Sequence, residues 1–317
     1  MPDPAPEILR RNAGYLASVG LVIMWSSGFV GAELGVRAGG SPLQLLSWRF
    51  AILAVMLLTT CLVLRVDLTD RRAWGRQALI GLLSQAAFLV LIFEGVSQGV
   101  DGGTAALIAS LQPLLVATVA GRILGERTTA TMWVGMVLGL TGVAVVVSGN
   151  LGLGSAPLWA YALPVAGMLC LAAGTVLTQR LRPTESLLQS LTMQIVTTAV
   201  VLVAASVVLG QVTVPAEPGF WGAVLWLVLL STLGGYLLYV FVTRTRGATV
   251  ASVLLYLTPP TTMLWVWLMF GVPITPVAVA GMAISAIGVT MVLRSRSDRS
   301  MRLPQPYTRR RRRRHGR

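Results

Sequence analysis

The sequence is poor in charge and contains no lysine. Only 11% of its 317 residues are charged, and all 25 basic residues are arginine. A typical soluble domain carries about 25% charged residues, which it needs to cover a surface in contact with water. This composition therefore excludes an ordinary soluble globular domain.

Histidine and cysteine are almost absent. The one histidine is His315, and the two cysteines, Cys61 and Cys170, each lie inside an apolar run. Metal sites built from these residues need more ligands than this, so we expect free thiols, no metal and no cofactor. The sequence also lacks a Walker-type phosphate loop and paired intramembrane aspartates, which argues against an enzyme.

Long apolar runs dominate what is present. Hydrophobic residues make up 55% of the chain, and the mean hydropathy is +0.76. Runs of about 20 apolar residues can cross roughly 30 Å of hydrocarbon as helices. We therefore predict an all-α polytopic membrane protein. Its ten transmembrane helices are expected at about 14–35, 42–64, 75–95, 103–122, 131–148, 158–178, 187–209, 219–241, 249–270 and 276–293.

The segment 104–148 recurs 146 positions later without a gap. Ten identities fall in 44 pairs, and they include Pro113 with Pro259 and three glycines in register. Five spans per repeat is an odd number, so the second copy should enter the membrane in the opposite sense. We divide the chain into an N-terminal tail (1–13), two five-helix repeats (14–148 and 158–293), an external linker (149–157) and an Arg-rich cytoplasmic tail (294–317).

The arginine distribution predicts the orientation. If the N-terminus is cytoplasmic, the inner segments hold 23 arginines, of which 11 belong to the tail from Arg294 onward. The outer loops then hold only Arg37, and Arg49 lies inside a span. By the positive-inside rule, both termini should be cytoplasmic. The membrane is expected to be the bacterial plasma (inner) membrane.

Several sequence stretches are similar to a known family. They are MWSSGFVGAELG (24–35), SWRF (47–50), ALIASLQPLLVATVAGRILGERTT (106–129), LCLAAGTVLTQRL (169–181) and ATVASVLLYLTPPTTMLWVWLMFGVPIT (248–275). Over about residues 14–293 the chain resembles EamA-type transporters of the drug/metabolite transporter superfamily. The resemblance implies ten helices in two inverted repeats and carrier-type transport, often export of amino acids or other small metabolites, commonly driven by ion gradients. Family members often keep an acidic residue where Val272-Pro273 stands here, so we assign that turn no coupling role.

Three charged residues lie within or at the ends of the predicted spans, all in the outer third: Glu33, Arg49 and Glu94. Charge in a bilayer is costly and marks candidate functional positions. Together they suit a paired structural network, an external gate, or a site where Arg49 binds a substrate carboxylate. Either glutamate could also carry a proton. Interfacial, solvated glutamates are an open alternative.

Pro113 and Pro259 lie near the middle of their predicted spans. A proline cannot bond the carbonyl four residues earlier, so each should break its helix and free a carbonyl. In lipid such a carbonyl must face protein or a watery cavity. We expect both bends to face the inside of the bundle, although a kink needed only for packing remains open.

Polar and aromatic side chains on these spans are candidates for a midplane site, with ordinary packing as the alternative. They are Trp25, Ser26, Gln85, Gln112, Gln194, Tyr236, Tyr239 and Tyr256. Aromatic walls with a few amides and hydroxyls suit an amphipathic small molecule.

The leading interpretation is a secondary transporter that exports a small metabolite, amino acid or drug-like compound by alternating access around a midplane cavity. The alternative is a membrane scaffold that docks through its Arg-rich tail. That tail should bind anionic headgroups; nucleic-acid binding is disfavoured because no folded or aromatic motif accompanies it. The pattern Gly135-x-x-x-Gly139, with its partner Gly281-x-x-x-Ser285, permits close helix packing or a homodimer seam.

Overall fold

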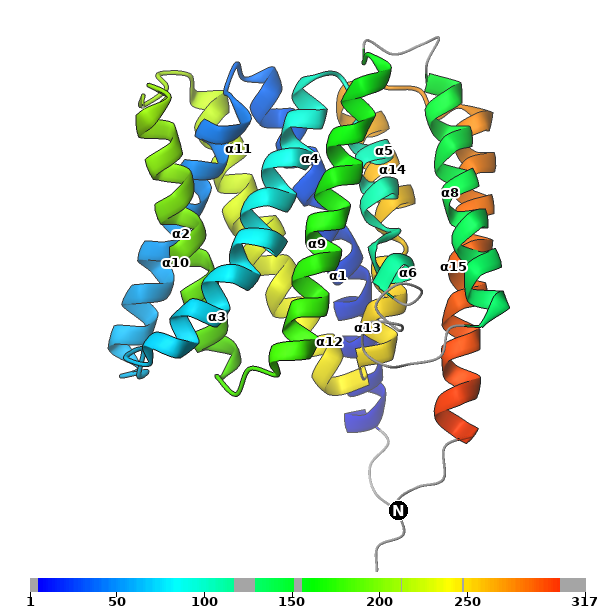
Figure 1. The fold of residues 1–317 in the computed structure, drawn as a ribbon, viewed down its shortest axis with the longest axis horizontal. Coiled ribbons are helices and arrows are strands. Elements are labelled where there is room, and N and C mark those ends of the chain that lie inside the picture. The colour runs from blue at the N-terminus through cyan, green and yellow to red at the C-terminus, as the bar shows by residue number, and fades with distance from the viewer. Residues whose placement is uncertain (1–4, 117–128, 151–155, 212, 247, 303–317) are drawn as a thin grey trace, which may run out of the picture.

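A computed structural model describes residues 5–116, 129–150, 156–211, 213–246 and 248–302 (Figure 1). These residues form helices and no strand, which confirms the all-α prediction. Seven helical stretches are long and apolar enough to cross a membrane, and two shorter apolar helices accompany them. The seven are Gly14–Arg37, Pro42–Val63, Arg71–Ser97, Ala130–Gly149, Leu158–Leu181, Leu187–Val208 and Pro218–Thr245; the shorter ones are Gly102–Leu115 and Pro276–Met291.

The elements follow in simple order along the chain. In the first half they are α1 (Ala5–Arg37), α2 (Pro42–Val63), α3 (Arg71–Gly81), η1 (Leu82–Ala87), α4 (Phe88–Ser97), α5 (Gly102–Ala109), α6 (Gln112–Leu115) and α8 (Ala130–Asn150). In the second half they are η3 (Leu158–Tyr161), α9 (Ala162–Leu181), α10 (Leu187–Val208), α11 (Pro218–Trp226), η4 (Leu227–Gly234), α12 (Gly235–Arg246), α13 (Ala248–Leu255), α14 (Thr258–Phe270) and α15 (Pro276–Arg302).

The outermost helices extend beyond the predicted spans. Helix α1 begins at Ala5, inside the segment expected as a tail, and α15 continues to Arg302, past the expected end at residue 293. Hydropathy marks only the part of a helix that fits in lipid, so it misses helical turns that continue into water. The arginine run 309–314 lies outside the described residues.

Local signals fix several helix starts. The Ser41 hydroxyl accepts the N–H of Gln44, and Pro42 occupies the first turn of α2. A capping box joins Ser186 and Gln189 at the start of α10. Such caps bond N–H groups that have no partner within the helix.

Two π-helical segments, η1 and η4, interrupt the third span of each half. Shifted by the repeat distance of 146, residues 82–87 correspond to 228–233, which lie inside η4. Single π-turns are rare in α-helices and occur often at functional sites. The equivalent placement indicates a shared feature of both halves.

The two predicted helix breaks are present. The N–H of Leu111 bonds the carbonyl of Ile108 at 3.1 Å, and the N–H of Leu257 bonds that of Leu254 at 3.0 Å. Pro113 and Pro259 then stand in the first turns of α6 and α14. Pro259 is buried, but Pro113 is exposed. The exposure of Pro113 is compatible with a ring that faces lipid and with one that faces a watery cavity, so the orientation of its bend stays a prediction.

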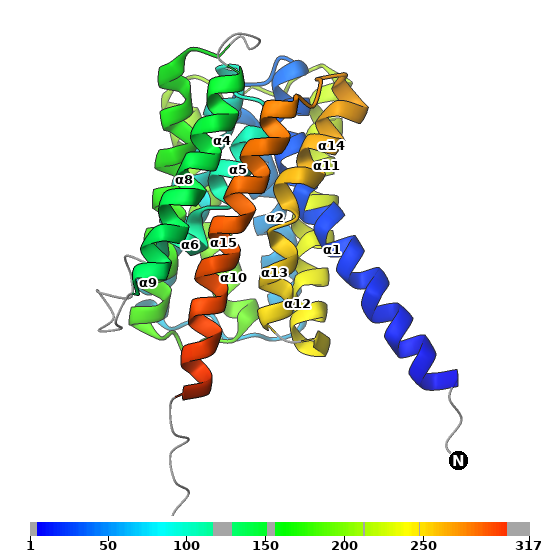
Figure 2. The ribbon, with the colours of Figure 1, turned by 90° about the vertical axis from the view of Figure 1, so that its right-hand side faces the viewer.

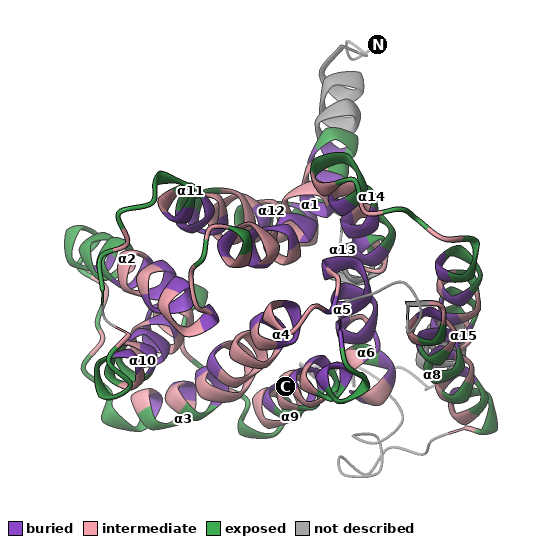
Figure 3. Cartoon of the chain, turned by 90° about the horizontal axis from the view of Figure 1, so that it is seen from above, coloured by how far each residue is buried: buried purple, intermediate pink, exposed green. Residues whose placement is uncertain are grey.

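Helices α8 and α15 pack side by side at one edge of the bundle (Figures 1 and 3). Their backbones meet through glycine: a Cβ at Gly142 would lie 2.5 Å from the carbonyl oxygen of Gly281. A Cβ at Gly288 would likewise collide with the carbonyl oxygen of Gly135. The small-residue pattern thus packs two helices of one chain.

The described chain begins and finishes at the same end of the bundle, which we call the terminal end (Figure 1). The α2–α3 and α9–α10 connections also lie there, with Arg65, Arg71 and Arg182. Figure 2 shows α1 and α15 reaching beyond the other helices on this side.

Candidate functional site

Arg49 is the one charged residue that is buried as a whole residue in the part of the chain that the structure describes. It lies in α2 and is 7% exposed. Its Nη2 donates to the hydroxyl of Thr232 in η4 at 2.9 Å, and its guanidinium carbon lies 5.5 Å from the centroid of the Phe50 ring. Its Nε is buried and has no hydrogen-bond partner. The site therefore holds a cation with one neutral polar partner.

The carboxylates expected beside Arg49 are engaged elsewhere. Glu33 pairs with Arg37, one helical turn away, at 2.8 Å, and its Oε2 is buried without a partner. Glu94 accepts a hydrogen bond from Gln98 at 2.9 Å. No ion pair among the described residues includes Arg49. The expected Glu33–Arg49–Glu94 network is therefore not formed, because each glutamate finds a partner four residues along its own helix.

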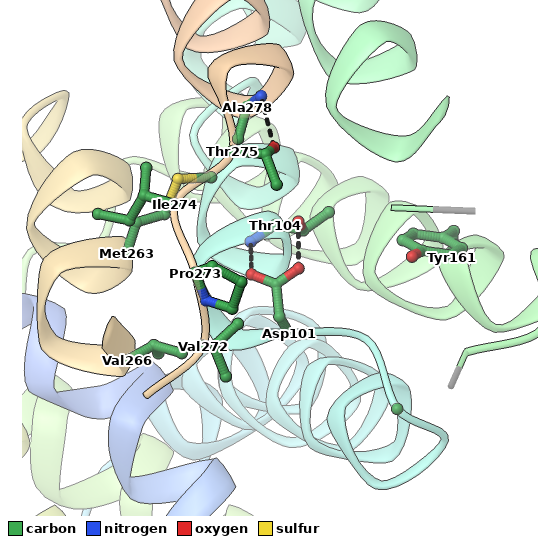
Figure 4. Close-up of a pocket in the computed structure, with 11 residues that line it drawn as sticks. Asp101, Thr104, Tyr161, Met263, Val266, Val272, Pro273, Ile274, Thr275 and Ala278 are labelled. Carbon is green, nitrogen blue, oxygen red and sulfur yellow. Dashed lines mark hydrogen bonds between the residues drawn. The ribbon is translucent and has the colours of Figure 1, made fainter. Parts of the chain in front are cut away.

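A small pocket of about 120 Å³ opens at the end opposite the termini (Figure 4). Its lining comes from the start of α5, the end of α14 and the turn into α15: Gly99, Asp101, Thr104, Tyr161, Met263, Val266, Val272, Pro273, Ile274, Thr275 and Ala278. Asp101 is the N-cap of α5, and its carboxylate accepts hydrogen bonds from the backbone N–H and the hydroxyl of Thr104 in the first turn of that helix. The pocket thus has one carboxylate on a mostly apolar wall.

Asp101 and Tyr161 were missed by the sequence reasoning. Among the charges it considered only those within or at the ends of spans, and Asp101 lies in the connection before α5. The signal was the string Asp101-Gly-Gly-Thr104, an N-cap pattern directly before an apolar helix. Asp101 also lies close enough to Glu33 for an electrostatic interaction. Two carboxylates thus approach each other at this end of the bundle.

A ladder of hydrogen-bonded amides connects η1 and α3 with α10. Gln85 donates to Gln194 at 2.8 Å, and Gln194 donates to Gln77 at 2.7 Å. Gln77 is fully buried and donates to Ser190 at 3.1 Å and to Glu185 at 3.3 Å. The structure thus brings the predicted Gln85 and Gln194 together and adds Gln77 and Glu185, which the sequence reasoning missed.

Glu185 ends this ladder at the terminal end, in the connection before α10. Burial raises the pKa of its carboxyl group. Hydrogen bonds from its own backbone N–H, Arg76 and Gln77, with the charge of Arg76, lower that pKa more, so the net value lies below the ordinary 4.5. Glu185 is therefore an ionised partner of Arg76 at neutral pH.

The remaining predicted residues form separate contacts. The rings of Trp25 and Tyr239 lie 5.7 Å apart between centroids, and Gln112 donates to the Thr175 hydroxyl at 2.8 Å. The Ser26 hydroxyl bonds the carbonyl of Val22 in its own helix at 2.6 Å. Tyr236 and Tyr256 are half-buried. The printed contacts of the expected midplane set are thus pairs on different helices, and a single substrate site built from them stays a prediction.

Packing across the bundle differs between its two ends. Away from the termini, α1 packs on α4 and α5, and α2 packs on α4 and α11. Toward the terminal end, α12 and α13 pack on α1, whereas α3, α9 and α10 form another group. Among the described residues, no substantial packing joins α12 or α13 to that second group. The described helices are therefore joined more tightly at the end opposite the termini.

Comparison with known proteins matches this chain to a protein family. The model of the EamA-like transporter family matches residues 12–148 and again 158–294, two segments offset by 146. The chain is 28% identical to the uncharacterized inner membrane transporter YedA of Escherichia coli (strain K12) over 241 residues, 75% of this chain and 77% of that one. It is 25% identical to a probable terminal-alkyne amino-acid exporter of Streptantibioticus cattleyicolor over 289 residues, 90% and 95% of the two chains.

A solved crystal structure of a protein supports the fold alone. It superposes with a TM-score of 0.60 at 17% identity and covers 89% of this chain and 97% of that one. The named relatives are transporters and not enzymes. From the family match over both halves, together with the apolar helices that carry it, we conclude that the chain is a membrane protein of the EamA-like transporter family.

Proposed function

We propose that this protein is a secondary transporter that exports a small metabolite, amino acid or drug-like compound by alternating access. Two five-helix repeats, inserted in opposite senses with ten spans in all, move against each other around a central substrate path. Repeats of this kind are typical of carriers that bind substrate near the bilayer midplane.

The reciprocal glycine contacts carry this proposal. Gly142 meets Gly281, and the residues shifted by 146 in the opposite sense, Gly288 and Gly135, also meet. A contact that repeats when its two members exchange roles is the property of a two-fold relation between the halves. A two-fold axis in the membrane plane relates repeats of opposite orientation.

The unequal packing of the two ends supports alternating access. Helix α1 joins α4 and α5 away from the termini, while α12 and α13 stay apart from α9 and α10 near them. With the termini cytoplasmic, this is a conformation closed toward the outside. Exchange of the two repeats' conformations would close the inner end and open the outer one.

We infer the substrate class from the polarity of the candidate side chains on the spans. The Trp25–Tyr239 pair offers aromatic surface, and the Gln85–Gln194 pair offers amides. Such a mixture suits an amphipathic molecule. The Streptantibioticus cattleyicolor relative is named as a probable terminal-alkyne amino-acid exporter. Its named substrate is thus an amphipathic molecule.

The arginine distribution supports cytoplasmic termini, and we place the protein in a bacterial inner membrane. The E. coli relative is named as an inner membrane protein. Two predictions stay untested. One is that the Arg-rich tail binds anionic headgroups, and the other is that the protein forms a homodimer. Residues 303–317, which carry most of that tail, lie outside the described residues.

Overexpression followed by a screen of extracellular metabolites and of drug resistance tests the proposal. Cells that express the full chain should accumulate at least one metabolite outside, or resist at least one compound, relative to cells with an empty vector. A chain lacking residues 303–317 should retain this effect. An effect that disappears with the tail would favour the docking scaffold instead.

A further inference from the structure

We propose that Arg49 is the anchor for a carboxylate of the transported molecule, so that the substrates are amphipathic carboxylates. This assignment rests on the transport function proposed above, and it names the chemical class that the site selects. The assignment follows from three properties of Arg49: burial without a counter-charge, an unpaired hydrogen-bond donor, and a position between the two repeats.

Burial without a counter-charge is the first property. Arg49 is 7% exposed, and a guanidinium remains charged at any physiological pH. Removing a charge from water is costly unless an opposite charge compensates it. The ion pairs of the described chain join Arg37 with Glu33, and Arg76 with Asp70 and Glu185. Within the part of the chain that the structure describes, Arg49 therefore has no anionic partner.

An unpaired hydrogen-bond donor is the second property. Thr232 accepts one hydrogen bond from Nη2, while its own hydroxyl donates to the carbonyl of Leu227 at 2.9 Å. The Nε of Arg49 has no acceptor. A guanidinium presents several N–H groups in one plane, which match the two oxygens of a carboxylate. Thr232 thus positions the guanidinium and leaves donor capacity for a ligand.

The repeat itself shows that the fold does not need this charge. The residue 146 positions after Arg49 is Ile195, which is also buried, at 4% exposure. An apolar side chain therefore satisfies the equivalent place in the second repeat. The arginine occurs once and has a role that packing does not supply.

The position between repeats is the third property. Arg49 belongs to α2 of the first repeat, and its partner Thr232 belongs to η4 of the second. A movement of one repeat against the other changes the surroundings of the guanidinium. An anion bound at Arg49 is then sensed by both halves, which couples substrate binding to the conformational change.

The test compares two probes of equal shape and different charge on the purified full chain at about pH 7.5, where a carboxylic acid is ionised. Thermal unfolding is followed with 3-phenylpropionate and with the neutral 3-phenylpropanamide. We expect the acid to raise the melting temperature of the wild type and the amide to leave it unchanged, since ligands stabilise the state that they bind. Arg49→Gln should raise the half-maximal concentration of the acid at least about tenfold.

Two further variants separate binding from folding. Without ligand, Arg49→Gln should melt at the wild-type temperature or above it, because an uncompensated buried charge has been removed. Thr232→Val keeps the charge and should weaken acid binding less than Arg49→Gln. The exposed Arg72, in α3, provides the matched control: Arg72→Gln should keep the full response.

Equal responses to acid and amide, or an unchanged acid response in Arg49→Gln, would overturn the assignment. A lower ligand-free melting temperature of Arg49→Gln with the acid response intact would make Arg49 structural. Neutral exported compounds in the expression screen, with equal probe responses, would retain the transporter and reject the anchor. Absence of export with an acid-specific response would instead reject the transport proposal.

Discussion

Ser285 donates its hydroxyl to the carbonyl of Gly139, the residue 146 positions earlier in the chain, at 3.4 Å. These two residues are equivalent positions in the proposed inverted repeat, so the proposed two-fold axis would pass through their contact. Gly142–Gly281 and Gly135–Gly288 lie on either side of it as a reciprocal pair. The α8–α15 contact is therefore the strongest structural support for the proposed symmetry.

A methyl group at this contact should destabilise the protein. In Gly142→Ala the new Cβ would lie 2.5 Å from the carbonyl oxygen of Gly281 and 2.6 Å from the backbone nitrogen of Ser285, so a backbone must shift. Overpacking of this kind costs about 1–3 kcal/mol. The measurement is the midpoint of thermal unfolding of the purified protein in detergent.

Gly222→Ala is the matched control for this substitution. A Cβ at Gly222 meets no atom within 4 Å, and alanine favours a helix over glycine. Its midpoint should equal or exceed that of the wild type. Equal midpoints for Gly142→Ala and Gly222→Ala would contradict the close backbone contact.

The amide ladder should show strong coupling between its members. In Gln194→Leu the amide of Gln85 loses its acceptor and the carbonyl oxygen of Gln77 loses its donor. Each unpaired buried group costs about 1–3 kcal/mol. Gln85→Leu combined with Gln194→Leu should cost less than the sum of the single changes, as measured by a double-mutant cycle of unfolding free energies.

Gln44→Leu is the control for the loss of a buried amide hydrogen bond. The amide of Gln44 donates to Thr213 at an exposed site. Water can replace that partner, so Gln44→Leu should have a much smaller effect. Additive costs for Gln85 and Gln194 would show that the two amides do not support each other.

Glu185 should make stability depend on acid pH. Its folded-state pKa lies below the ordinary 4.5, since the hydrogen bonds and charge of Arg76 outweigh the burial that raises it. A depressed pKa contributes stability above the unfolded-state value, and this contribution is lost as pH falls through the folded-state value. The melting temperature of the wild type should therefore fall as pH drops below about 5.

Glu185→Gln should lack this part of the acid response, because an amide does not titrate. Its melting temperature at neutral pH should be lower than that of the wild type, since the ion pair with Arg76 is lost. If both proteins lose the same number of degrees over this pH range, the Glu185–Arg76 pair is not the origin of the response.

Sequence patterns were sufficient to predict features that depend on a single short segment, such as a helix or a helix break. Apolar length marked the long helices, and Pro113 and Pro259 marked the breaks after Ala109 and Leu255. The burial of Arg49 also agrees with its place inside an apolar run. In each case the physical cause, such as a missing N–H or a missing polar face, lies within a few neighbouring residues.

Partners were harder to predict, since they depend on which helices meet. Arg49 was expected beside Glu33 and Glu94, yet it contacts Thr232, which lies 183 positions away. The Gln77–Gln194 contact likewise joins α3 to α10 over 117 positions. No local pattern encodes such pairings, and a favourable i,i+4 contact, such as Glu33 with Arg37, competes with any distant one.

Accessibility of residues 146 positions apart tests the inverted repeat most directly. Arg71 and Glu217 form one such pair, and Ala38 and Thr184 form another. Each would be replaced by cysteine in a chain without Cys61 and Cys170 and treated with a membrane-impermeant maleimide in intact cells. We predict labelling of Glu217→Cys and Ala38→Cys in intact cells, and of Arg71→Cys and Thr184→Cys only after permeabilisation. Labelling of both members of a pair from the same side would contradict the account.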